Sequence, residues 1–508
     1  MNKFIKVRTN MIWQGVYQVV ILVLGFIVPY MVLNVYGSEV NGLTSTIKQI
    51  ILLSSLASAG ITTAATYTLY KPVQENDCAK IAGVLESVKK SYKYITIITG
   101  VVCLLSSVIL AFFQKGSLSP ILVFVACILT SMNTLLDLYF TATTSVFLTA
   151  TQDKHILSIG MLIAGVIMYM GQILVCVLNL HFIFLYATSV VGCIFKVIYL
   201  NICFNKRYSK YKIDKNIKHD KGEFSFRSVG YAFANEVSHT VNVASQSIIL
   251  SLLYGLAEAS VLSVYMMVVN SLSLIAQIVY TSFGPSFGAV VAEGDYKKMN
   301  DVFEIFQYTI MFLNAFLYMC AVPLILPFVK LYTHNVTDIQ YISKILMVEC
   351  ILYGIFYAIR VPYNIVVSTT GQFKKSATQT TLTCVITVVI SVLVSAYDYR
   401  LILSGSIIFY ATNTFYQHYM LKHEVEGFEN SHFWKHLMVT VVGILIMFFV
   451  SFVSNGIIVN RISQWVIMAM ITAGIAFVLL LIISWLVDRV SFKKSFKYFR
   501  QKIVSQSR

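Results

Sequence analysis

Residues 228–255 read SVGYAFANEVSHTVNVASQSIILSLLYG, a stretch that decides the fold because it combines membrane-spanning length with a polar stripe. A helix needs about 20 mostly apolar residues to cross a bilayer. The stripe consists of four polar residues whose steps of four, three and four place them on one helical face. They are Asn235, His239, Asn242 and Gln246. Glu236 lies beside this stripe.

Polar groups at membrane depth are costly, so this face is expected to contact protein or a water-filled cavity rather than lipid. Two interpretations follow. The stripe forms hydrogen bonds between helices, or it is one wall of a polar cavity in a transporter. The first apolar segment carries a second stripe at spacing four, formed by Asn10, Gln14 and Gln18.

The composition is that of an integral membrane protein. The 508 residues are 57% hydrophobic and 12% charged, with a mean hydropathy of +0.76, whereas about a quarter of the residues in a soluble domain are charged. Nine cysteines are scattered without a CxxC pair, which is typical of small buried residues. Neither a disulfide framework, a metal site nor a cofactor is predicted.

Fourteen apolar segments predict an all-α polytopic membrane protein with about 14 transmembrane helices. In chain order they are 11–33, 42–70, 94–113, 120–143, 156–178, 182–203, 228–253, 260–283, 305–328, 343–368, 376–396, 401–421, 436–455 and 465–487.

The basic residues indicate the orientation. If the N-terminus is cytoplasmic, the inner connections hold 30 Lys and Arg residues and the outer connections hold four. This positive-inside bias predicts that both termini are cytoplasmic. The net charge of +16 is therefore a topology signal with a weak attraction to anionic lipid, and no nucleic-acid partner is predicted.

The chain repeats itself at an offset of 218 residues. An Asp, followed by Lys and by apolar residues, begins what reads as an amphipathic helix at the inner surface in each repeat. The offset between matching residues then increases by two residues before the last two pairs. The matching pairs are Tyr36-Gly37 with Tyr254-Gly255, Asp77 with Asp295, Lys80 with Lys298, Gln152 with Gln372, and Lys154 with Lys374.

The repeat predicts two lobes of six spans, at 1–203 and 228–421. Because six is even, both lobes enter the membrane from the same side and the repeat is parallel. Residues 204–227 form a basic cytoplasmic linker between the lobes. Residues 422–487 add two spans outside the repeat, and 488–508 form a basic cytoplasmic tail.

Several features together resemble polysaccharide flippases. They are the six plus six parallel spans with two further spans, the segment IILSLLYGLAEASVLSVYMMVVNSL at 248–272, and the Gly294-Asp295 turn after GPSFG at 284–288. This family, which moves O-antigen and capsule repeat units, belongs to the superfamily of multidrug and toxin extrusion antiporters and the lipid II flippase. The resemblance covers nearly the whole chain.

The resemblance implies a function. Such proteins move an undecaprenyl-diphosphate-linked oligosaccharide across the bacterial cytoplasmic membrane by alternating access, and polysaccharide polymerase or assembly proteins are further expected partners. The alternatives are a cation-coupled multidrug exporter, a lipid II-type flippase, or a scaffold for polysaccharide assembly. Proton-coupled members of the multidrug branch commonly carry an Asp in span one, and this chain has neither Asp nor Glu there.

A diphosphate calls for cationic side chains in the cavity. Three cations are predicted to be buried in spans, namely Lys48 in span two and Lys344 and Arg360 in span ten. The alternative is that these long side chains reach back to the membrane interface. Lys196 lies near an inner end and is interpreted as an interfacial anchor.

Three carboxylates fall within predicted spans, Asp137, Glu236 and Glu349. An intramembrane carboxylate can bind a proton or sodium ion, or pair with Lys or Arg. Glu236 with His239 is the best candidate for cation coupling, since His titrates near neutrality. The alternative is an internal hydrogen-bond network, and Asp137 lies near enough to the inner end to be hydrated.

The sequence carries no Walker loop, HExxH or GxSxG motif, so we predict that the protein is not an enzyme. A membrane glycosyltransferase or polymerase of the same pathway would more often show a large outer loop. Every predicted outer loop here is short, which disfavours that interpretation.

Overall fold

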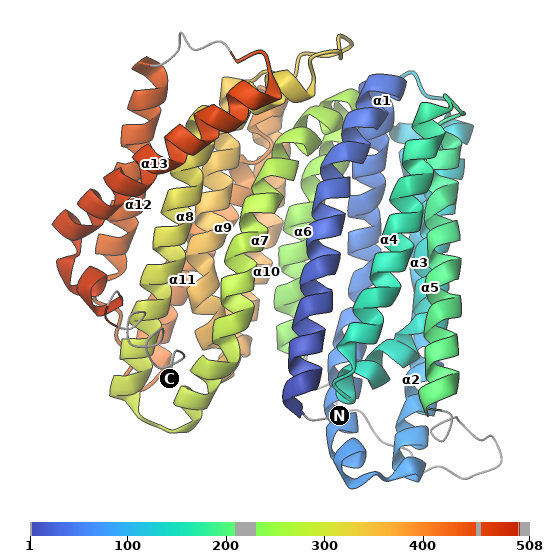
Figure 1. Cartoon of the computed structure of the whole chain (residues 1–508), viewed down its shortest axis with the longest axis horizontal. Helices are drawn as coiled ribbons and strands as arrows, with labels where there is room; N and C mark the ends of the chain where they lie inside the picture. The colour runs from blue at the N-terminus through green and yellow to red at the C-terminus, as the bar shows by residue number, and fades with distance from the viewer. Residues whose placement is uncertain (1–2, 209–229, 454–458, 496, 498–508) are drawn as a thin grey trace. The chain divides into compact units, whose positions relative to one another are not determined.

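The structure is a computed structural model that describes residues 3–208, 230–453, 459–495 and 497. This part of the chain is almost entirely α-helical and contains no β-strand (Figure 1), which confirms the predicted all-α fold. The helices are α1 (Lys3–Glu75), α2 (Cys78–Phe113), α3 (Pro120–Ala150), α4 (Lys154–Val177), α5 (Ile183–Tyr208), α6 (Gly230–Leu253), α7 (Leu256–Ala292), α8 (Tyr296–Tyr332), α9 (Lys344–Thr370), α10 (Phe373–Ser395), α11 (Ser404–Glu424), α12 (Phe433–Val453) and α13 (Ile462–Val487).

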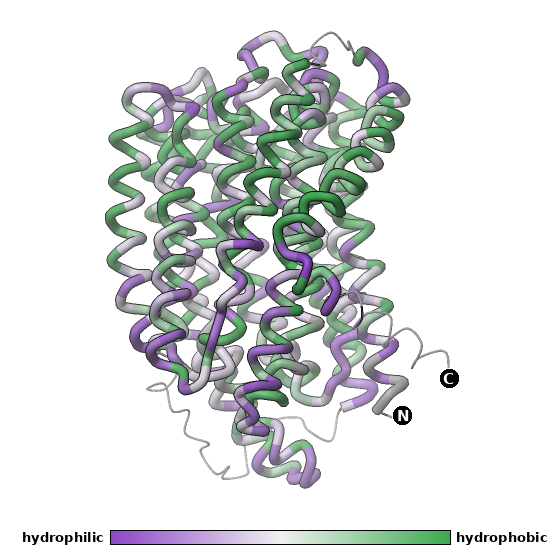
Figure 2. The backbone as a smooth tube through the Cα atoms, turned by 90° about the vertical axis from the view of Figure 1, so that its left-hand side faces the viewer, coloured by the Kyte–Doolittle hydropathy of each residue, from purple (hydrophilic) through white to green (hydrophobic). Residues whose placement is uncertain are grey.

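Eleven helices in the described part are long and apolar enough to cross a membrane. Apolar residues run along the helices and hydrophilic residues gather at many of their ends (Figure 2), as expected for segments in contact with hydrocarbon. Two described helices are not apolar enough to be counted among the eleven, namely α6, which carries the polar stripe, and α11. The protein is therefore a multi-pass membrane protein.

The first helix contains two of the predicted spans. α1 runs through 73 residues, but Gly37 has φ 80° and ψ −176°, which is not helical. Only glycine adopts such a conformation readily, so the helix is interrupted at this residue. With α1 counted as two segments, every one of the fourteen predicted spans overlaps a helix.

The predicted helix starts at Asp77 and Asp295 are confirmed. The Asp77 carboxylate accepts a hydrogen bond from the backbone N–H of Lys80 at 3.0 Å, and Asp295 accepts one from Lys298 at the same distance. Both are N-caps. The helices that they begin, α2 and α8, do not stop at a surface as predicted. Each continues as a single helix of 36 or 37 residues that includes the next span.

Two pairs of residues at the predicted repeat offset share a positive φ. Gly37 and Gly255, 218 residues apart, have φ of 80° and 154°. The residues before the two capping aspartates also have positive φ, with 53° at Asn76 and 72° at Gly294. In the predicted repeat, the two halves of α1 and α2–α5 would correspond to α6–α11, with α12 and α13 outside it.

Residues 1–260 form the first of two compact units. Its core combines apolar side chains of α1, α2, α3, α4 and α5. α6 also packs against α1 in this unit, where the Thr46 and Ser251 hydroxyls are 2.5 Å apart. At Gly42 of α1 an added Cβ would lie 1.7 Å from the carbonyl oxygen of Leu256, so this backbone approach requires glycine.

Residues 261–508 form the second unit. α8 is central to it and packs against α9, α12 and α13, while α11 packs against α9 and α10. Its core is rich in buried aromatic rings, including Tyr265, Phe303 and Tyr363. The predicted lobes, 1–203 and 228–421, are divisions by sequence repeat and stay a prediction. Most of the predicted linker at 204–227 lies outside the described residues, as does the end of the tail.

Candidate functional site

The polar stripe of α1 holds this helix to the start of α4. Asn10 donates from Nδ2 to the carbonyl of Gln152 at 2.8 Å, and its Oδ1 accepts from the backbone N–H of His155 at 2.8 Å. Gln14 accepts from the Ser158 hydroxyl at 2.8 Å. Gln18, the third predicted residue, is exposed. Asn10 and Gln14 therefore act within the first unit as contacts between helices, and Gln18 has the exposure that a ligand contact needs.

An ion pair that sequence reasoning missed lies next to this stripe. Lys6 of α1 contacts the carboxylate of Asp153 at 2.9 Å, and the Tyr208 hydroxyl donates to the same carboxylate. Burial alone would raise the pKa of Asp153, but the hydrogen bonds from Tyr208 and Lys6 outweigh it and hold the pKa below its ordinary value. Asp153 thus joins α1, the α3–α4 turn and the end of α5.

The residues of the polar stripe on α6 differ in how deeply they are buried. Asn242 and Gln246 are buried, with 1% and 2% of their surface exposed, whereas Asn235 and His239 are half-buried. Glu236 is exposed. The position of Glu236 on an exposed face weakens its expected role as a desolvated cation-coupling group with His239, since a desolvated carboxylate is what that role requires.

The burial predicted for Lys344 is wrong, because its side chain at the first turn of α9 is exposed. Lys48 in α1 has exposed surface but is surrounded by enough protein to be desolvated, so its place in a cavity stays a prediction. Ser343 caps α9 through a hydrogen bond to the backbone N–H of Leu346, which places Lys344 at the helix start. A long, flexible side chain at a helix end extends its ammonium outward, and this explains the difference for Lys344.

Arg360 differs from both lysines, because it is half-buried within α9. Its guanidinium carbon lies 5.2 Å from the ring centroid of Tyr410, a cation–π distance. Tyr353 and Tyr357 complete a cluster of three rings, with centroids 5.3 Å and 5.4 Å from that of Tyr410. We call Arg360 with these three tyrosines the arginine–tyrosine cluster.

The charge of Arg360 is not neutralised by a carboxylate. Among the described residues, no Asp or Glu pairs with it, and its buried Nε has no hydrogen-bond partner. A half-buried guanidinium without an anion retains its capacity for charge-assisted hydrogen bonds. Its planar fork suits bidentate recognition of a phosphate. The cluster is therefore the described site best suited to bind an anion.

Two of the carboxylates predicted within spans, the half-exposed Asp137 and the buried Glu349, have partners instead. Asp137 of α3 pairs with Lys196 of α5 at 2.6 Å, and the lysine side chain is only 11% exposed. Lys196 is thus an ion-pair partner of Asp137, and its interpretation as an interfacial anchor stays a prediction. Glu349 of α9 accepts hydrogen bonds from the backbone N–H of Leu403, at 2.8 Å, and from the Ser404 hydroxyl. An anion at the start of α11 is favoured by the helix dipole.

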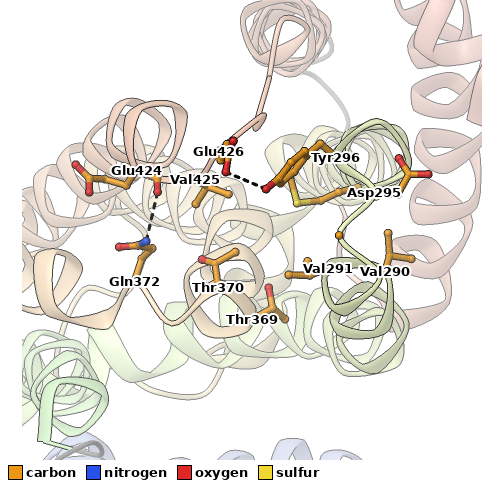
Figure 3. Close-up of a pocket in the computed structure, with 12 residues that line it drawn as sticks. Val290, Val291, Asp295, Tyr296, Thr369, Thr370, Gln372, Glu424, Val425 and Glu426 are labelled. Carbon is orange, nitrogen blue, oxygen red and sulfur yellow. Dashed lines mark hydrogen bonds between the residues drawn. The ribbon is translucent and has the colours of Figure 1, made fainter.

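A cavity of about 370 Å³ lies elsewhere in the second unit, between the α7–α8 turn, the α9–α10 turn and the end of α11 (Figure 3). Tyr296 donates to Glu426 at 3.1 Å across it, and Gln372 donates to the carbonyl of Glu424 at 3.4 Å. None of the predicted site residues lines this cavity. Its carboxylates would repel a diphosphate.

The comparisons with known proteins agree with this architecture. No protein-family model and no curated protein matches the sequence. The solved structure of the lipid II flippase MurJ, in an inward closed conformation, matches with a TM-score of 0.64 and 15% identity. The match covers 94% of this chain and 99% of that chain.

Two MATE transporters, the first described as a multidrug resistance transporter, match as well. An inward-facing MATE family transporter of the MOP superfamily gives a TM-score of 0.60 at 13% identity, over 83% of this chain and 98% of that chain. The Vibrio cholerae MATE transporter VcmN, in a bent form, gives 0.52 at 12% identity, over 84% and 99%. The chain shares the fold of these solved structures. At these identities the likeness extends to the fold alone.

Sequence reasoning found Arg360 but missed the tyrosines around it. The sequence does indicate two of these tyrosines. Tyr353, Tyr357 and Arg360 follow one another at steps of four and three and so share one helical face. Tyr410, from α11, is 50 residues further along the chain. Only the packing of α9 against α11 brings it to the guanidinium.

Proposed function

We propose that this protein moves an undecaprenyl-diphosphate-linked oligosaccharide across the bacterial cytoplasmic membrane, for the synthesis of a cell-surface polysaccharide. It would do so as a transporter rather than an enzyme, by alternating access between two lobes, with both termini cytoplasmic. The fold, which it shares with a lipid II flippase, supports a lipid-linked substrate.

The observation that carries the proposal is the arginine–tyrosine cluster. Arg360 would bind the diphosphate through charge-assisted hydrogen bonds, which are roughly twice as strong as neutral ones. Tyr357 is half-buried and so remains accessible, and its hydroxyl could donate to a phosphate or sugar oxygen. Tyr353 and Tyr410 are buried, with 3% and 0% exposed surface, and would hold the guanidinium in place.

The exposed predicted residues would contribute along the path. Lys48 has no ion-pair partner among the described residues, and we assign it a second, weaker contact with the diphosphate. Gln18 and the half-buried members of the α6 stripe, Asn235 and His239, would contact sugar hydroxyls. These neutral groups suit a sugar, because they can both donate and accept hydrogen bonds.

The carboxylates argue against cation-coupled drug export. A coupling site needs a carboxylate whose affinity for protons or sodium changes during transport. Asp137 is paired with Lys196, Glu349 is bound to the start of α11, and Glu236 is exposed rather than desolvated. In contrast, Arg360 and Lys48, for which the described residues provide no carboxylate partner, have the sign that attracts an anion.

The test is the undecaprenyl-linked lipid pool of a strain depleted of this protein. If the proposal is correct, lipid-linked oligosaccharide accumulates on the inner leaflet and surface polysaccharide is lost. Polymerase and assembly proteins, the further partners that we propose, would then lack their substrate. An unchanged pool with increased sensitivity to cationic drugs would instead assign the protein to multidrug export.

A further inference from the structure

Two histidines and an aspartate converge at one end of the last two helices. His432 precedes α12 directly, His436 lies in its first turn, and Asp488 follows α13. The Nδ1 of His432 and the Nε2 of His436 lie 3.1 Å and 3.0 Å from the same carboxylate oxygen, Oδ2 of Asp488. We call these three residues the His–His–Asp cluster.

The cluster is buried. His436 is 2% exposed and Asp488 is 1% exposed, while His432 is half-buried. The three facing atoms lie within 4.8 Å of one another. In a tetrahedral zinc site with bonds of about 2.0–2.1 Å, ligand atoms are about 3.3 Å apart, so a shift of roughly 1–2 Å would bring all three within bonding range.

The second nitrogen of each imidazole faces an oxygen acceptor. The Nδ1 of His436 lies 3.2 Å from the side-chain oxygen of Gln307, and the Nε2 of His432 lies 4.0 Å from a carboxylate oxygen of Glu304. Metal-binding histidines almost always direct the ring N–H that does not bind metal to a carbonyl or a carboxylate. Both histidines of the cluster have this arrangement.

The contact between His436 and Asp488 is close, with 3.0 Å between Nε2 and Oδ2. In the His436 tautomer that donates from Nδ1 to Gln307, 3.2 Å away, Nε2 directs a lone pair toward the carboxylate. A metal cation between the two atoms would then be bound by both of them.

We propose that His432, His436 and Asp488 bind a zinc ion. Two imidazoles and one carboxylate are a donor set that zinc accepts, and the ligands come from the start of α12 and the end of α13. Asp301 and Glu304 of α8 contact this region through Lys494 and Ser491. The bound ion would therefore fasten the ends of α12 and α13 beside α8, independently of the transported substrate.

The experiment is a zinc titration of the purified full-length protein at pH 7.5 after treatment with a chelator. We expect one zinc ion per chain by calorimetry and elemental analysis, with tetrahedral d–d absorption when cobalt replaces zinc. His436→Gln and the nearly isosteric Asp488→Asn should each weaken binding at least tenfold. The control is His423→Gln, which alters an exposed histidine of α11 and should bind as wild type does.

The variants must be compared with wild type in the chelator, where their thermal unfolding shows whether they are folded. The proposal is overturned if wild-type protein binds no stoichiometric zinc. It is also overturned if folded His436→Gln and Asp488→Asn bind zinc as tightly as His423→Gln does. In either case, the cluster is a histidine–aspartate contact network rather than a metal site.

Discussion

The guanidinium of Arg360 in α9 lies over the ring of Tyr410 in α11, with 5.2 Å between its central carbon and the ring centroid. This relationship holds a positive charge inside a membrane protein without a carboxylate beside it. Cation–π attraction offsets part of the cost of burial. An anionic ligand could then offset much of the remainder.

Replacement of Arg360 should impair transport more than replacement of a nearby exposed cation. Arg360→Gln removes charge-assisted hydrogen bonds worth about 1.5–3 kcal/mol each, so polysaccharide export should fall about tenfold or more. Lys344→Gln, at the exposed start of the same helix, should export at near the wild-type level. Both are measured as surface polysaccharide per molecule of membrane-inserted protein. Equal export by the two variants would contradict the role of Arg360.

The ion pair of Asp137 and Lys196 should act in stability rather than in ion coupling. Asp137→Asn leaves a largely buried ammonium unpaired. The loss should fall between the 1 kcal/mol or so of an exposed pair and the roughly 3–5 kcal/mol of a buried one. Thermal unfolding of the purified protein measures it.

The double variant Asp137→Asn with Lys196→Met separates the two roles. It removes the unpaired charge and should recover most of the stability and the transport. If stability returned and transport did not, Asp137 would have a coupling role.

Close helix packing at Gly42 should not tolerate even one methyl group. In Gly42→Ala the new Cβ would lie 1.7 Å from the Leu256 carbonyl oxygen, so the backbone itself must shift, at a cost of about 1–3 kcal/mol or more. Gly15→Ala is the matched control in the same helix, because nothing lies within 4 Å of its Cβ. A melting temperature equally unaffected by both changes would refute this packing.

Asp153 should make stability sensitive to acid. Its pKa is lowered in the folded protein, so its contribution is fully present above the ordinary Asp pKa of 3.8 and is lost as the pH falls below that value. Asp153→Asn should therefore unfold at a lower temperature than wild type at pH 7. The gap should narrow as the pH falls below 3.8 and close once the folded protein also binds the proton. A gap independent of pH would indicate that the carboxylate charge does not matter.

The sequence predicted what depends on local patterns. Hydropathy and length located the helices, and the aspartate caps were correct because a cap depends on residues three positions away. The depth of Arg360 within α9 followed from its distance to both ends of the span. These features require no knowledge of which helices are neighbours.

Contacts between distant helices could not be predicted in this way. Lys196 finds Asp137 59 positions earlier in the chain, and His432 finds Asp488 56 positions later. The burial of Lys344 was mispredicted for a related reason, since a span assigned by hydropathy does not reveal which of its faces is covered. The exposure of Glu236 on α6 could not be predicted for the same reason.

The most direct test of the central claim is transport in proteoliposomes that hold only this protein and an undecaprenyl-diphosphate-linked oligosaccharide. The fraction of oligosaccharide accessible to an added glycosidase reports movement between leaflets. We predict that the oligosaccharide moves rapidly between leaflets with the wild-type protein and with the Lys344→Gln variant. With Arg360→Gln, this movement should be about tenfold slower. Movement at the protein-free rate with correctly folded wild-type protein would contradict it.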